Sequence, residues 1–551
     1  MEFHLALEPY LETYRYKQTA LYAAFRDAIQ GGRFPYGTQL PSSRELGRRY
    51  GLSRGVVYQV YERLMAEGFL EAVLGSGTYV RYRQSLEPGN RLHTADLPLS
   101  DWGRRLEALA SERELRPRAT PNSRRFADVH PSGPVPEPSG VGVQSNGTPL
   151  PERQLVNTQA TSAASARLSP TRLPAVDQPS AEREIRFDFG HAAAQPFPAP
   201  EWRRLLYAEV RANTEAPAAA APAQGYRPLR EAIARHLRRA RGLDVTADTV
   251  VVVSGSMQAL ALLAQLLLNA GDKAVLENPG YTGIRSAVFA AGGVPVPGRV
   301  DGQGLVVEPW DARLVFVTPS RQFPTGAVMS LPRRQALLQW AAENGAVVIE
   351  DDFDSEFRHR GRPIEPLKGL DRDGRVVFVG TFTRTMQAQL RIGYAVLPER
   401  LVEPFVRALQ LYEPSPAAAL EQRALAQFMA GGGYERHMRR MGRLYSRRFD
   451  RFGRLFERVL GRLFEIVPSD AGLHIFARWR SDEAGYLRFR AHCAGAGVVW
   501  VDAQENYIGV AEPAACFFFA HLNEAELEEG VERMERVASA LGFGGLQAPE
   551  E

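Results

Sequence analysis

Hydrophobic and polar positions in the N-terminal part of the chain predict capped helices. Ser42 or Ser43 can cap a short helix over residues 45–50, in which Leu46 faces inward. Gly51 interrupts this helix, because glycine favours helix ends over helix interiors. The pattern therefore predicts one short helix and a turn before the next element.

A second helix and a hairpin follow. Ser53 can cap the helix, and its apolar residues keep helical spacing at Val56, Val57, Val60 and Leu64. Residues 69–73 and 78–80 have the pattern of two short strands, which the Gly75-Ser76-Gly77 turn joins. A cap, a break, a second cap and a glycine turn within residues 40–80 are typical of a winged helix-turn-helix.

From residue 185 onward, helical patterns alternate with short apolar runs. We predict helices at 202–212, 229–241 and 257–268, and strands at 250–253, 274–277, 314–318, 346–350 and 376–379. Short strands that alternate with helices form a mostly parallel, buried sheet. We therefore expect an α/β domain over residues 185–545, with a smaller C-terminal lobe at about 400–545 and a closing amphipathic helix at 524–541.

The stretch between these two regions, residues 84–184, has a different composition. It holds 13 of the 38 prolines and few large apolar residues, which is too little hydrophobic surface to offset the entropy of ordering. We expect a disordered or extended linker, with a short helix at 101–115 whose Trp102, Leu106 and Leu109 share a face. The sequence therefore predicts three parts: an N-terminal domain (1–83), a linker (84–184) and an α/β domain (185–545).

Composition and charge describe a mildly basic chain. The net charge is +4 and the pI is near 9.0, and residues 1–83 carry 11 Lys+Arg against 8 Asp+Glu. The excess at the N-terminal domain suits a nucleic-acid partner. No long apolar run predicts a membrane span and no secretion signal is evident, so we expect a cytoplasmic protein. Cys493 and Cys516 are too few for a disulfide framework or a metal cluster, and we expect inert core thiols.

Polar turns follow three of the predicted strands, where α/β sheets place their ligands. Residues 254–258, Ser-Gly-Ser-Met-Gln, open a helix and suit a phosphate. Residues 350–354 are acidic, and such a run is usually a solvated turn rather than a metal site. Residues 380–394 offer hydroxyls at Thr381, Thr383 and Thr385 and guanidinium groups at Arg384 and Arg391, which together could hold a phosphate or a carboxylate.

The N-terminal domain resembles the DNA-binding domain of GntR-type regulators. The resemblance runs from IQGGRFPYGTQLPSSREL to GSGTYV. It implies that a DNA duplex is contacted by Ser43, Arg44, Ser53, Arg54 and Tyr58, with Gly77 and Thr78 on the wing. Arginine side chains at positions 44, 48, 49, 54 and 63 could reach phosphates and base edges.

The remainder is similar to fold-type-I aminotransferases and, next to such a domain, to the MocR-type regulators. The motifs that carry the similarity include VVVSGSMQAL, VFVTPSRQFPTG, VVIEDDFDSEF and VVFVGTFTRTMQAQLRIGY. The resemblance implies a domain that binds pyridoxal 5′-phosphate as an aldimine, senses a small effector and forms a head-to-tail homodimer. On the matching positions it assigns the pocket to Ser256, Tyr281, Arg321, Asp351, Phe353, Thr381, Thr383, Arg384 and Arg391.

Three of these positions depart from the family pattern. Arg384 stands where the family has the Schiff-base lysine, Phe353 where it has a tyrosine beside the cofactor's phenolic oxygen, and Arg321 where it has a histidine. A guanidinium is always protonated in proteins, so Arg384 cannot form an aldimine. We therefore predict no catalytic residue, and pyridoxal phosphate binding, if any, only without a covalent bond. Arg478 and Arg480 are weak candidates for capturing a substrate carboxylate.

Lysine is scarce in this chain, with Lys17, Lys273 and Lys368 against 64 arginines. Lys273 lies in a turn expected to face solvent and Lys368 in a loop 16 residues before Arg384, so a relocated Schiff base is not expected. Two interpretations of Arg384 stay open. The pocket has either drifted after losing its cofactor or been rebuilt for an anionic ligand, with Arg321, Arg384 and Arg391 supplying the charge.

Three functional classes fit the sequence. The favoured class is a transcriptional regulator that binds a DNA operator, dimerises and senses a small-molecule effector. The alternatives are a working aminotransferase with an accessory DNA-binding domain, which the absent lysine disfavours, and a regulator whose large domain is only a dimerisation scaffold.

Overall fold

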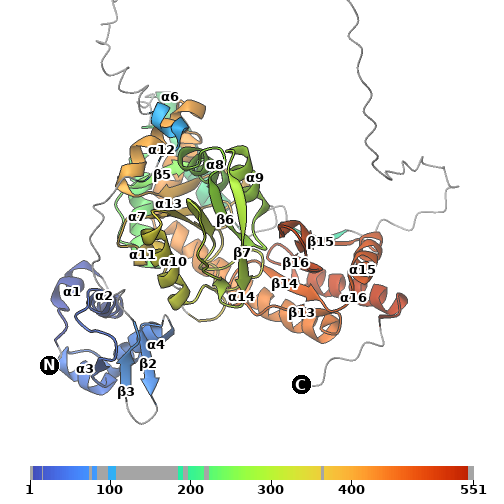
Figure 1. The fold of residues 1–551 in the computed structure, drawn as a ribbon, viewed down its shortest axis with the longest axis horizontal. Helices are drawn as coiled ribbons and strands as arrows, with labels where there is room; N and C mark the ends of the chain where they lie inside the picture. The colour runs from blue at the N-terminus through green and yellow to red at the C-terminus, as the bar shows by residue number, and fades with distance from the viewer. Residues whose placement is uncertain are drawn as a thin grey trace, which may run out of the picture. The chain divides into compact units, whose positions relative to one another are not determined.

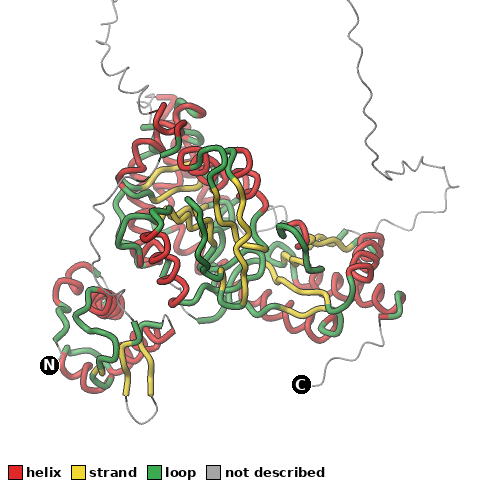
Figure 2. Tube along the Cα trace, in the orientation of Figure 1, coloured by secondary structure: helices red, strands yellow, loops and turns green. Residues whose placement is uncertain are grey.

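The computed structural model describes residues 4–14, 16–66, 68–73, 77–82, 97, 99–106, 184–189, 197–215, 222–361 and 365–543 (Figure 1). Most of the predicted linker, 84–184, lies outside the described residues. Helices and strands alternate through the larger part of the chain (Figure 2). No helix among the described residues is both long enough and apolar enough to cross a membrane.

The N-terminal domain is a winged helix-turn-helix. It contains α1 (Glu8–Thr13), α2 (Lys17–Gln30), β1 (Gln39–Leu40), α3 (Ser43–Arg49), α4 (Arg54–Ala66), β2 (Leu70–Val73) and β3 (Gly77–Val80). Ser42 caps α3 by accepting a hydrogen bond from the Glu45 amide, and the Ser53 hydroxyl accepts one from the Val56 amide at the start of α4. The strands form an antiparallel sheet in the order β1-β3-β2, which is the wing.

The core of this domain confirms the predicted inward positions. Leu46, Val57, Val60 and Leu64 are fully buried, whereas Val56 is only half-buried. The elements α1, α2 and β1 were not predicted, and α2 contributes the buried Phe25, whose ring meets Tyr61 edge-on. The residues of the predicted wing turn, 74–76, lie outside the described part of the chain.

A large mixed sheet forms the centre of the second domain. Its order is β5-β12-β11-β10-β9-β6-β7-β8. The five neighbours β11, β10, β9, β6 and β7 run parallel, whereas β12 pairs antiparallel with both β11 and β5. The strands are β5 (Val250–Val253), β6 (Lys273–Asn278), β7 (Val294–Asp301), β8 (Gly304–Leu305), β9 (Leu314–Val317), β10 (Val347–Asp352), β11 (Val376–Thr381) and β12 (Gly393–Val396). All five predicted strands are therefore present in a mostly parallel sheet.

Helices cover both faces of this sheet. They are α6 (Ala199–Glu215), α7 (Arg227–Arg241), α8 (Ser256–Leu267), α9 (Thr282–Ala290), α10 (Leu331–Glu343), α11 (Leu367–Leu370), α12 (Glu399–Tyr412) and α13 (Ala419–Ala430). One hydrophobic cluster joins α8, α9 and α12 to the sheet, and a second joins α7 and α13 to it. Because α12 and α13 pack on the large sheet, the smaller lobe begins later than the predicted residue 400.

The smaller lobe is built on a five-stranded sheet in the order β13-β14-β16-β15-β4. It holds β13 (Phe464–Ile466), β14 (His474–Trp479), β15 (Val498–Asp502), β16 (Ala514–Phe518), α15 (Glu483–Gly495) and α16 (Glu524–Ala540), and the 28-residue α14 (Gly433–Leu460) leads into it. Its edge strand β4 (Ile185–Phe187) pairs parallel with β15. The lobe therefore takes one strand from before the large sheet, which the sequence pattern did not predict.

A short helical segment at residues 101–106 confirms the first part of the helix predicted at 101–115. Trp102 and Leu106 pack against the hydrophobic cluster that contains α8, and the Ser100 hydroxyl donates to the Gln265 carbonyl. The rest of that helix, including Leu109, lies outside the described residues.

Candidate functional sites

The winged helix presents the predicted DNA-contacting side chains on its surface. Arg44, Ser53, Arg54 and Tyr58 are exposed on or beside α3 and α4, and Ser43 is half-exposed. Gly77 and Thr78 begin β3 next to the wing turn. Arg63 differs from the prediction, because its guanidinium carbon lies 3.5 Å from the centre of the Tyr22 ring and so stabilises the domain itself.

The second candidate site lies where strands of the large sheet end. Asp351 is near the end of β10, Thr381 ends β11, and Ser256 opens α8 directly after β5. Burial and the Asp351 charge raise the pKa of the Tyr281 hydroxyl, and the charges of Arg384 and Arg391 oppose this rise. Four of the predicted pocket residues therefore lie close enough to influence one another.

The residues predicted to hold a phosphate include Arg391, Thr381 and Thr383. The Arg391 guanidinium donates to the Ser254 carbonyl at 3.1 Å, and a Cβ placed on Gly255 would lie 2.9 Å from Arg391 Nη2. Arg391 holds a left-handed backbone conformation with φ 47°, which costs about 1–2 kcal/mol for a residue with a side chain. Thr381 Oγ1 accepts from the Thr383 amide, and Thr383 Oγ1 is buried with no partner among the described residues.

Arg384 follows the end of β11, where the sequence resemblance leads us to expect a cofactor lysine. Its guanidinium carbon lies 5.0 Å from the centre of the Phe189 ring, a cation–π contact. Among the described residues it has no ion pair, and Asp354 acts on it only as a nearby charge. Burial lowers the pKa of this guanidinium, yet arginine stays protonated in proteins. Arg384 therefore places a cation at this end of the strand.

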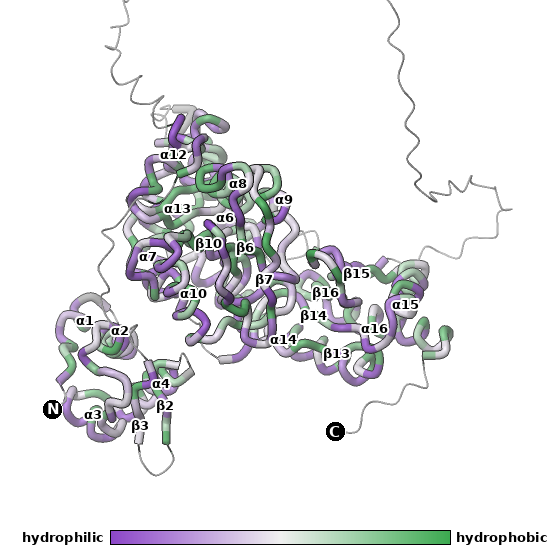
Figure 3. Tube along the Cα trace, in the orientation of Figure 1, coloured by the Kyte–Doolittle hydropathy of each residue, from purple (hydrophilic) through white to green (hydrophobic). Residues whose placement is uncertain are grey.

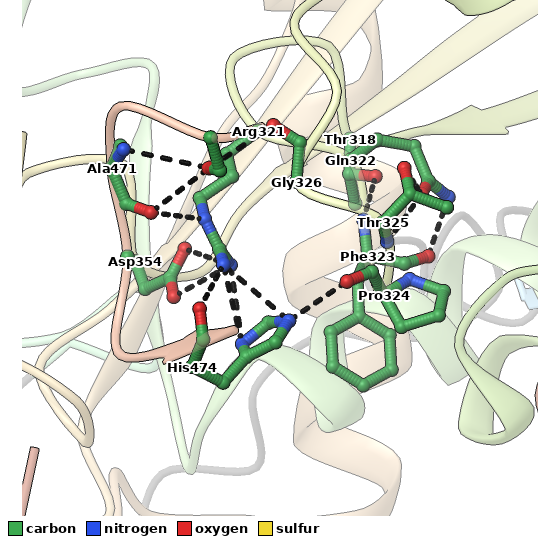
Figure 4. A network of polar contacts seen from close by, with 12 residues as sticks. Thr318, Arg321, Gln322, Phe323, Pro324, Thr325, Gly326, Asp354, Ala471 and His474 are labelled. Atoms are coloured by element: carbon green, nitrogen blue, oxygen red, sulfur yellow. Dashed lines mark hydrogen bonds and ion pairs between the residues drawn. The ribbon is translucent and has the colours of Figure 1, made fainter. Parts of the chain in front are cut away.

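Arg321 does not contribute a free charge to the pocket. Its Nη1 lies 3.0 Å from Asp354 Oδ2, and the two side chains are 1% and 2% exposed. Its Nε donates to the Ala471 carbonyl and its Nη2 to the His474 carbonyl (Figure 4). This network joins the loop after β9 to β14 of the smaller lobe. The expectation that Arg321 adds to a ligand-binding charge is therefore wrong, because Asp354 neutralises it.

Two neighbours fit this arginine closely. His474 Nε2 lies 2.8 Å from the Pro324 carbonyl, so Nε2 carries the proton and Nδ1 accepts from Arg321 at 3.3 Å. Burial, with the Arg321 charge adding to it, lowers the pKa of His474 well below its usual range and keeps the ring neutral. Gly472 has φ +95°, and a Cβ there would lie 2.1 Å from Arg321 Cζ, so only glycine fits.

The acidic run at 350–354 is buried, so the expectation of a solvated turn is wrong. Glu350 accepts from the Leu367 and Lys368 amides, and Asp352 forms an ion pair with Arg241 at 2.7 Å. Asp351 is 6% exposed, and its Oδ1 has no partner among the described residues. Burial, and then the Asp352 charge, raises the pKa of Asp351 to about 7. No group of metal-binding side chains is present in the described part of the chain.

Aromatic rings form one wall of the site. Phe323 meets Tyr281 and Phe353 edge-on at 5.9 and 5.6 Å between ring centres. Phe353 packs against the apolar cluster of Phe323, Phe476 and Phe518. Position 353 is thus part of an apolar wall and offers no hydroxyl.

The lysines are remote from this site or engaged elsewhere. Lys273 bonds to Asp311 at an exposed strand start, as predicted. Lys368 lies in α11 rather than in a loop, and its Nζ donates to the carbonyl of Val376, at the opposite end of β11 from Thr381. Arg478 pairs with Glu512, and Arg480 donates to the Gly461 carbonyl. Cys493 and Cys516 are buried, and burial raises the pKa of both thiols, as expected of inert core residues.

Four residues of the site were not predicted from the sequence: Phe189, Asp354, Glu413 and His474. Glu413 accepts hydrogen bonds from Ser254 Oγ and Gln258 Nε2, both at 2.8 Å, beside the phosphate side. Asp354 belongs to the acidic run and could have been paired with Arg321 by charge alone. The other three belong to segments with no motif, and only the fold brings them to the site.

Two family models match the chain. Residues 17–80 match bacterial regulatory proteins of the gntR family, and residues 195–534 match aminotransferase class I and II. The second match covers more than half of the chain and includes every residue of the second candidate site except Phe189.

Several proteins resemble the chain over both domains. The probable rhizopine catabolism regulatory protein MocR of Rhizobium meliloti is 32% identical over 529 residues, which cover 95% of this chain and 94% of that protein. The pyridoxine biosynthesis transcriptional regulator PdxR of Corynebacterium glutamicum is 30% identical over 432 residues, 78% of this chain and 76% of the relative. Among solved structures, a kynurenine aminotransferase of Pyrococcus horikoshii superposes with a TM-score of 0.60 at 24% identity, covering 66% of this chain and 92% of the enzyme. At that identity the structural likeness shows the fold alone.

Proposed function

Because the chain belongs to the aminotransferase class I and II family and, like its MocR-type relatives, joins that domain to a gntR-family helix-turn-helix, we propose that it is a DNA-binding transcriptional regulator that senses a ligand without forming a Schiff base. The observation that carries the second half of this proposal is Arg384. It follows β11, where the sequence resemblance leads us to expect the cofactor lysine, and neither Lys273 nor Lys368 reaches that end of the strand.

The residues of the pocket fit some contacts of pyridoxal phosphate and not others. The unpartnered Asp351 Oδ1 and Thr383 Oγ1 suit a ring nitrogen and a phosphate, and Ser256 at the α8 N-terminus and Arg391 suit the same phosphate. Arg384 supplies no nucleophilic amine, and Phe353 supplies no hydroxyl. The pocket therefore suits weak, exchangeable binding of this cofactor and no transaminase chemistry.

Charge indicates the class of effector. Arg321 and Arg241 are neutralised by Asp354 and Asp352, whereas Arg384 has no ion pair among the described residues. A guanidinium at Arg384 that no carboxylate neutralises among the described residues, together with Arg391, favours a ligand with a carboxylate or phosphate group. An anionic effector is therefore part of the proposal.

Assembly completes the proposed function. Operators read by winged helices usually contain two half-sites, so a homodimer through the large domain suits this architecture. Deleting residues 1–83 should leave a dimer in sedimentation, and deleting 185–551 should leave a monomer that binds DNA weakly.

The test is selection of binding sites from random duplex DNA with the full chain. We expect recovery of a repeated site that binds at least ~10³-fold more tightly than unrelated duplex, as specific regulators do. Binding without sequence preference would contradict the proposed function, and so would a monomeric full chain at micromolar concentration.

A further inference from the structure

The long helix α14 carries a stripe of exposed arginines. Its buried face holds Tyr434, Met441, Tyr445, Phe452 and Phe456, so the residues between them face outward. Hydrophobic and hydrophilic residues alternate along this helix (Figure 3). The outward positions near the middle of the helix include Arg440, Arg443 and Arg447, which are exposed and have no hydrogen bond or ion pair among the described residues.

These three arginines line one side of an open hollow of about 1000 Å³, which we call the arginine hollow. Its charged lining is entirely basic: Arg358, Arg440, Arg443, Arg447 and Arg448. Beside the lining, Asp470 Oδ2 lies 3.8 Å from Arg358 Nη2, and the charges of Glu524 and Glu526 act on Arg448. Farther along α14, Arg451 pairs with Glu524 and Glu528 of α16. In the lining of the arginine hollow, by contrast, Arg440, Arg443 and Arg447 have no ion pair among the described residues.

From this arrangement we infer that the arginine hollow binds the phosphate backbone of DNA, as a second contact besides the winged helix. The inference rests on the proposed DNA-binding function. Residues 440 to 447 extend about 10 Å along the helix axis at 1.5 Å per residue. Duplex DNA carries about six phosphates over that length, one for each ~1.7 Å of its axis. Guanidinium groups on exposed, flexible stems suit such a row of anions without reading its sequence.

Other occupants fit the hollow less well. A small-molecule site encloses most of its ligand and is lined mainly by apolar groups, whereas this hollow is open and basic. A protein interface needs apolar anchors at its centre, and the half-buried Leu444 is the one large apolar side chain in the lining. The row of arginines matches a polyanion whose charge is spread along its length.

The test uses the full chain with Arg440→Gln, Arg443→Gln and Arg447→Gln combined. Glutamine keeps the helix propensity while removing three charges. The matched control combines Arg204→Gln, Arg211→Gln and Arg400→Gln, three exposed arginines elsewhere on the large domain. Fluorescence anisotropy measures affinity for a selected operator and for unrelated duplex over a salt series.

We expect the slope of log K against log[salt] to fall in magnitude by about 2–3 for the α14 variant, since each lost phosphate contact removes about 0.9. Affinity for unrelated duplex should fall together with affinity for the operator, and the control should keep the wild-type slope. A triple Arg→Lys variant at the same positions should also keep it, because lysine still contacts phosphate as a point charge. If the triple glutamine variant fails to fold, the single variants Arg440→Gln, Arg443→Gln and Arg447→Gln serve as the readout, and each should lower the magnitude of the slope by about 0.9.

An α14 variant with the wild-type slope would overturn the inference. An equal loss of slope in the control variant would also overturn it, because the effect would then report the change in net charge alone. Arg44→Ala separates this outcome from failure of the proposed function. If Arg44→Ala loses operator preference while the α14 variant matches wild type, the regulator stands and the hollow does not bind DNA. If neither the wild-type protein nor any variant prefers one DNA sequence over another, the proposed function fails instead.

Discussion

The guanidinium carbon of Arg384, which follows the end of β11, lies 5.0 Å from the centre of the Phe189 ring. An aromatic ring stabilises a cation without neutralising it, so the charge of Arg384 remains available to a bound anion. The neighbouring Arg321 is the opposite case, because it forms a buried ion pair with Asp354. The charge of Arg384 therefore affects ligand binding, whereas the charge of Arg321 affects the stability of the fold.

The winged helix should lose affinity when its exposed arginines are shortened. Arg44→Ala or Arg54→Ala should each weaken operator binding by about 1–3 kcal/mol if the side chain reads a base edge. The matched control is Arg33→Ala, which removes an exposed arginine that follows α2 rather than α3 or α4. Anisotropy at physiological salt is the measurement. Operator binding equal to wild type in both the Arg44 and the Arg54 variants would show that this face does not read DNA.

The Arg321–Asp354 pair should be strongly coupled. Asp354→Asn leaves the Arg321 charge buried without its partner, which should cost about 3–5 kcal/mol of unfolding free energy. Arg321→Met should cost a similar amount for the converse reason. The double variant Arg321→Met/Asp354→Leu should lose about 2 kcal/mol less than the sum of the single losses. Chemical denaturation of the large domain measures all three, and additive losses would mean that the pair is not an interacting unit.

Asp351 should make stability depend on pH. Its pKa is raised to about 7 by burial and the Asp352 charge, against about 4 in an unfolded chain. Between pH 4 and pH 7 Asp351 is protonated in the folded state and ionised in the unfolded state. The contribution of protonated Asp351 to the free energy of unfolding therefore falls as pH rises from 4 to 7 and is absent above 7.

Asp351→Asn should remove that loss. It should raise unfolding free energy by about 4 kcal/mol at pH 8 and by only about 1 kcal/mol at pH 5, because a three-unit shift corresponds to ~4 kcal/mol and only the first unit of it is lost by pH 5. Asp373→Asn, at an exposed position, should match wild type at both pH values. Thermal melts at pH 5 and pH 8 provide the measurement. Equal stabilisation at both values would show that Asp351 does not titrate in this range.

Periodicity and motifs predicted much of the fold because the strands of the large sheet are short, apolar and separated by turn residues. The run Val250–Val253 is fully buried, as continuous apolar strands of a parallel sheet are. The edge strand Ile185–Phe187 was not predicted, because its pairing with β15 joins segments more than 300 residues apart. Such pairing leaves no local signal.

The candidate site was predicted where a motif fixed the chemistry and not where burial decided it. The prediction that Arg384 forms no Schiff base follows from its residue type alone. The role of Arg321 depended on Asp354, Ala471 and His474, which the fold brings together from separate segments. The acidic run was expected to be solvated, because its burial depends on Arg241 and on the amides of Leu367 and Lys368.

The central claim is that this pocket holds no covalent pyridoxal phosphate, and borohydride reduction of the cofactor-incubated protein tests it most directly. The wild-type chain, reduced, digested and analysed by mass spectrometry, should carry no phosphopyridoxyl group at position 384 or at any of its three lysines, Lys17, Lys273 and Lys368. Arg384→Lys, treated identically, shows whether restoring one amine is sufficient for attachment in the remaining pocket. A reduced lysine adduct at stoichiometric yield in the wild-type protein would contradict the account, and its absence at all three lysines and at Arg384 is the result that the account predicts.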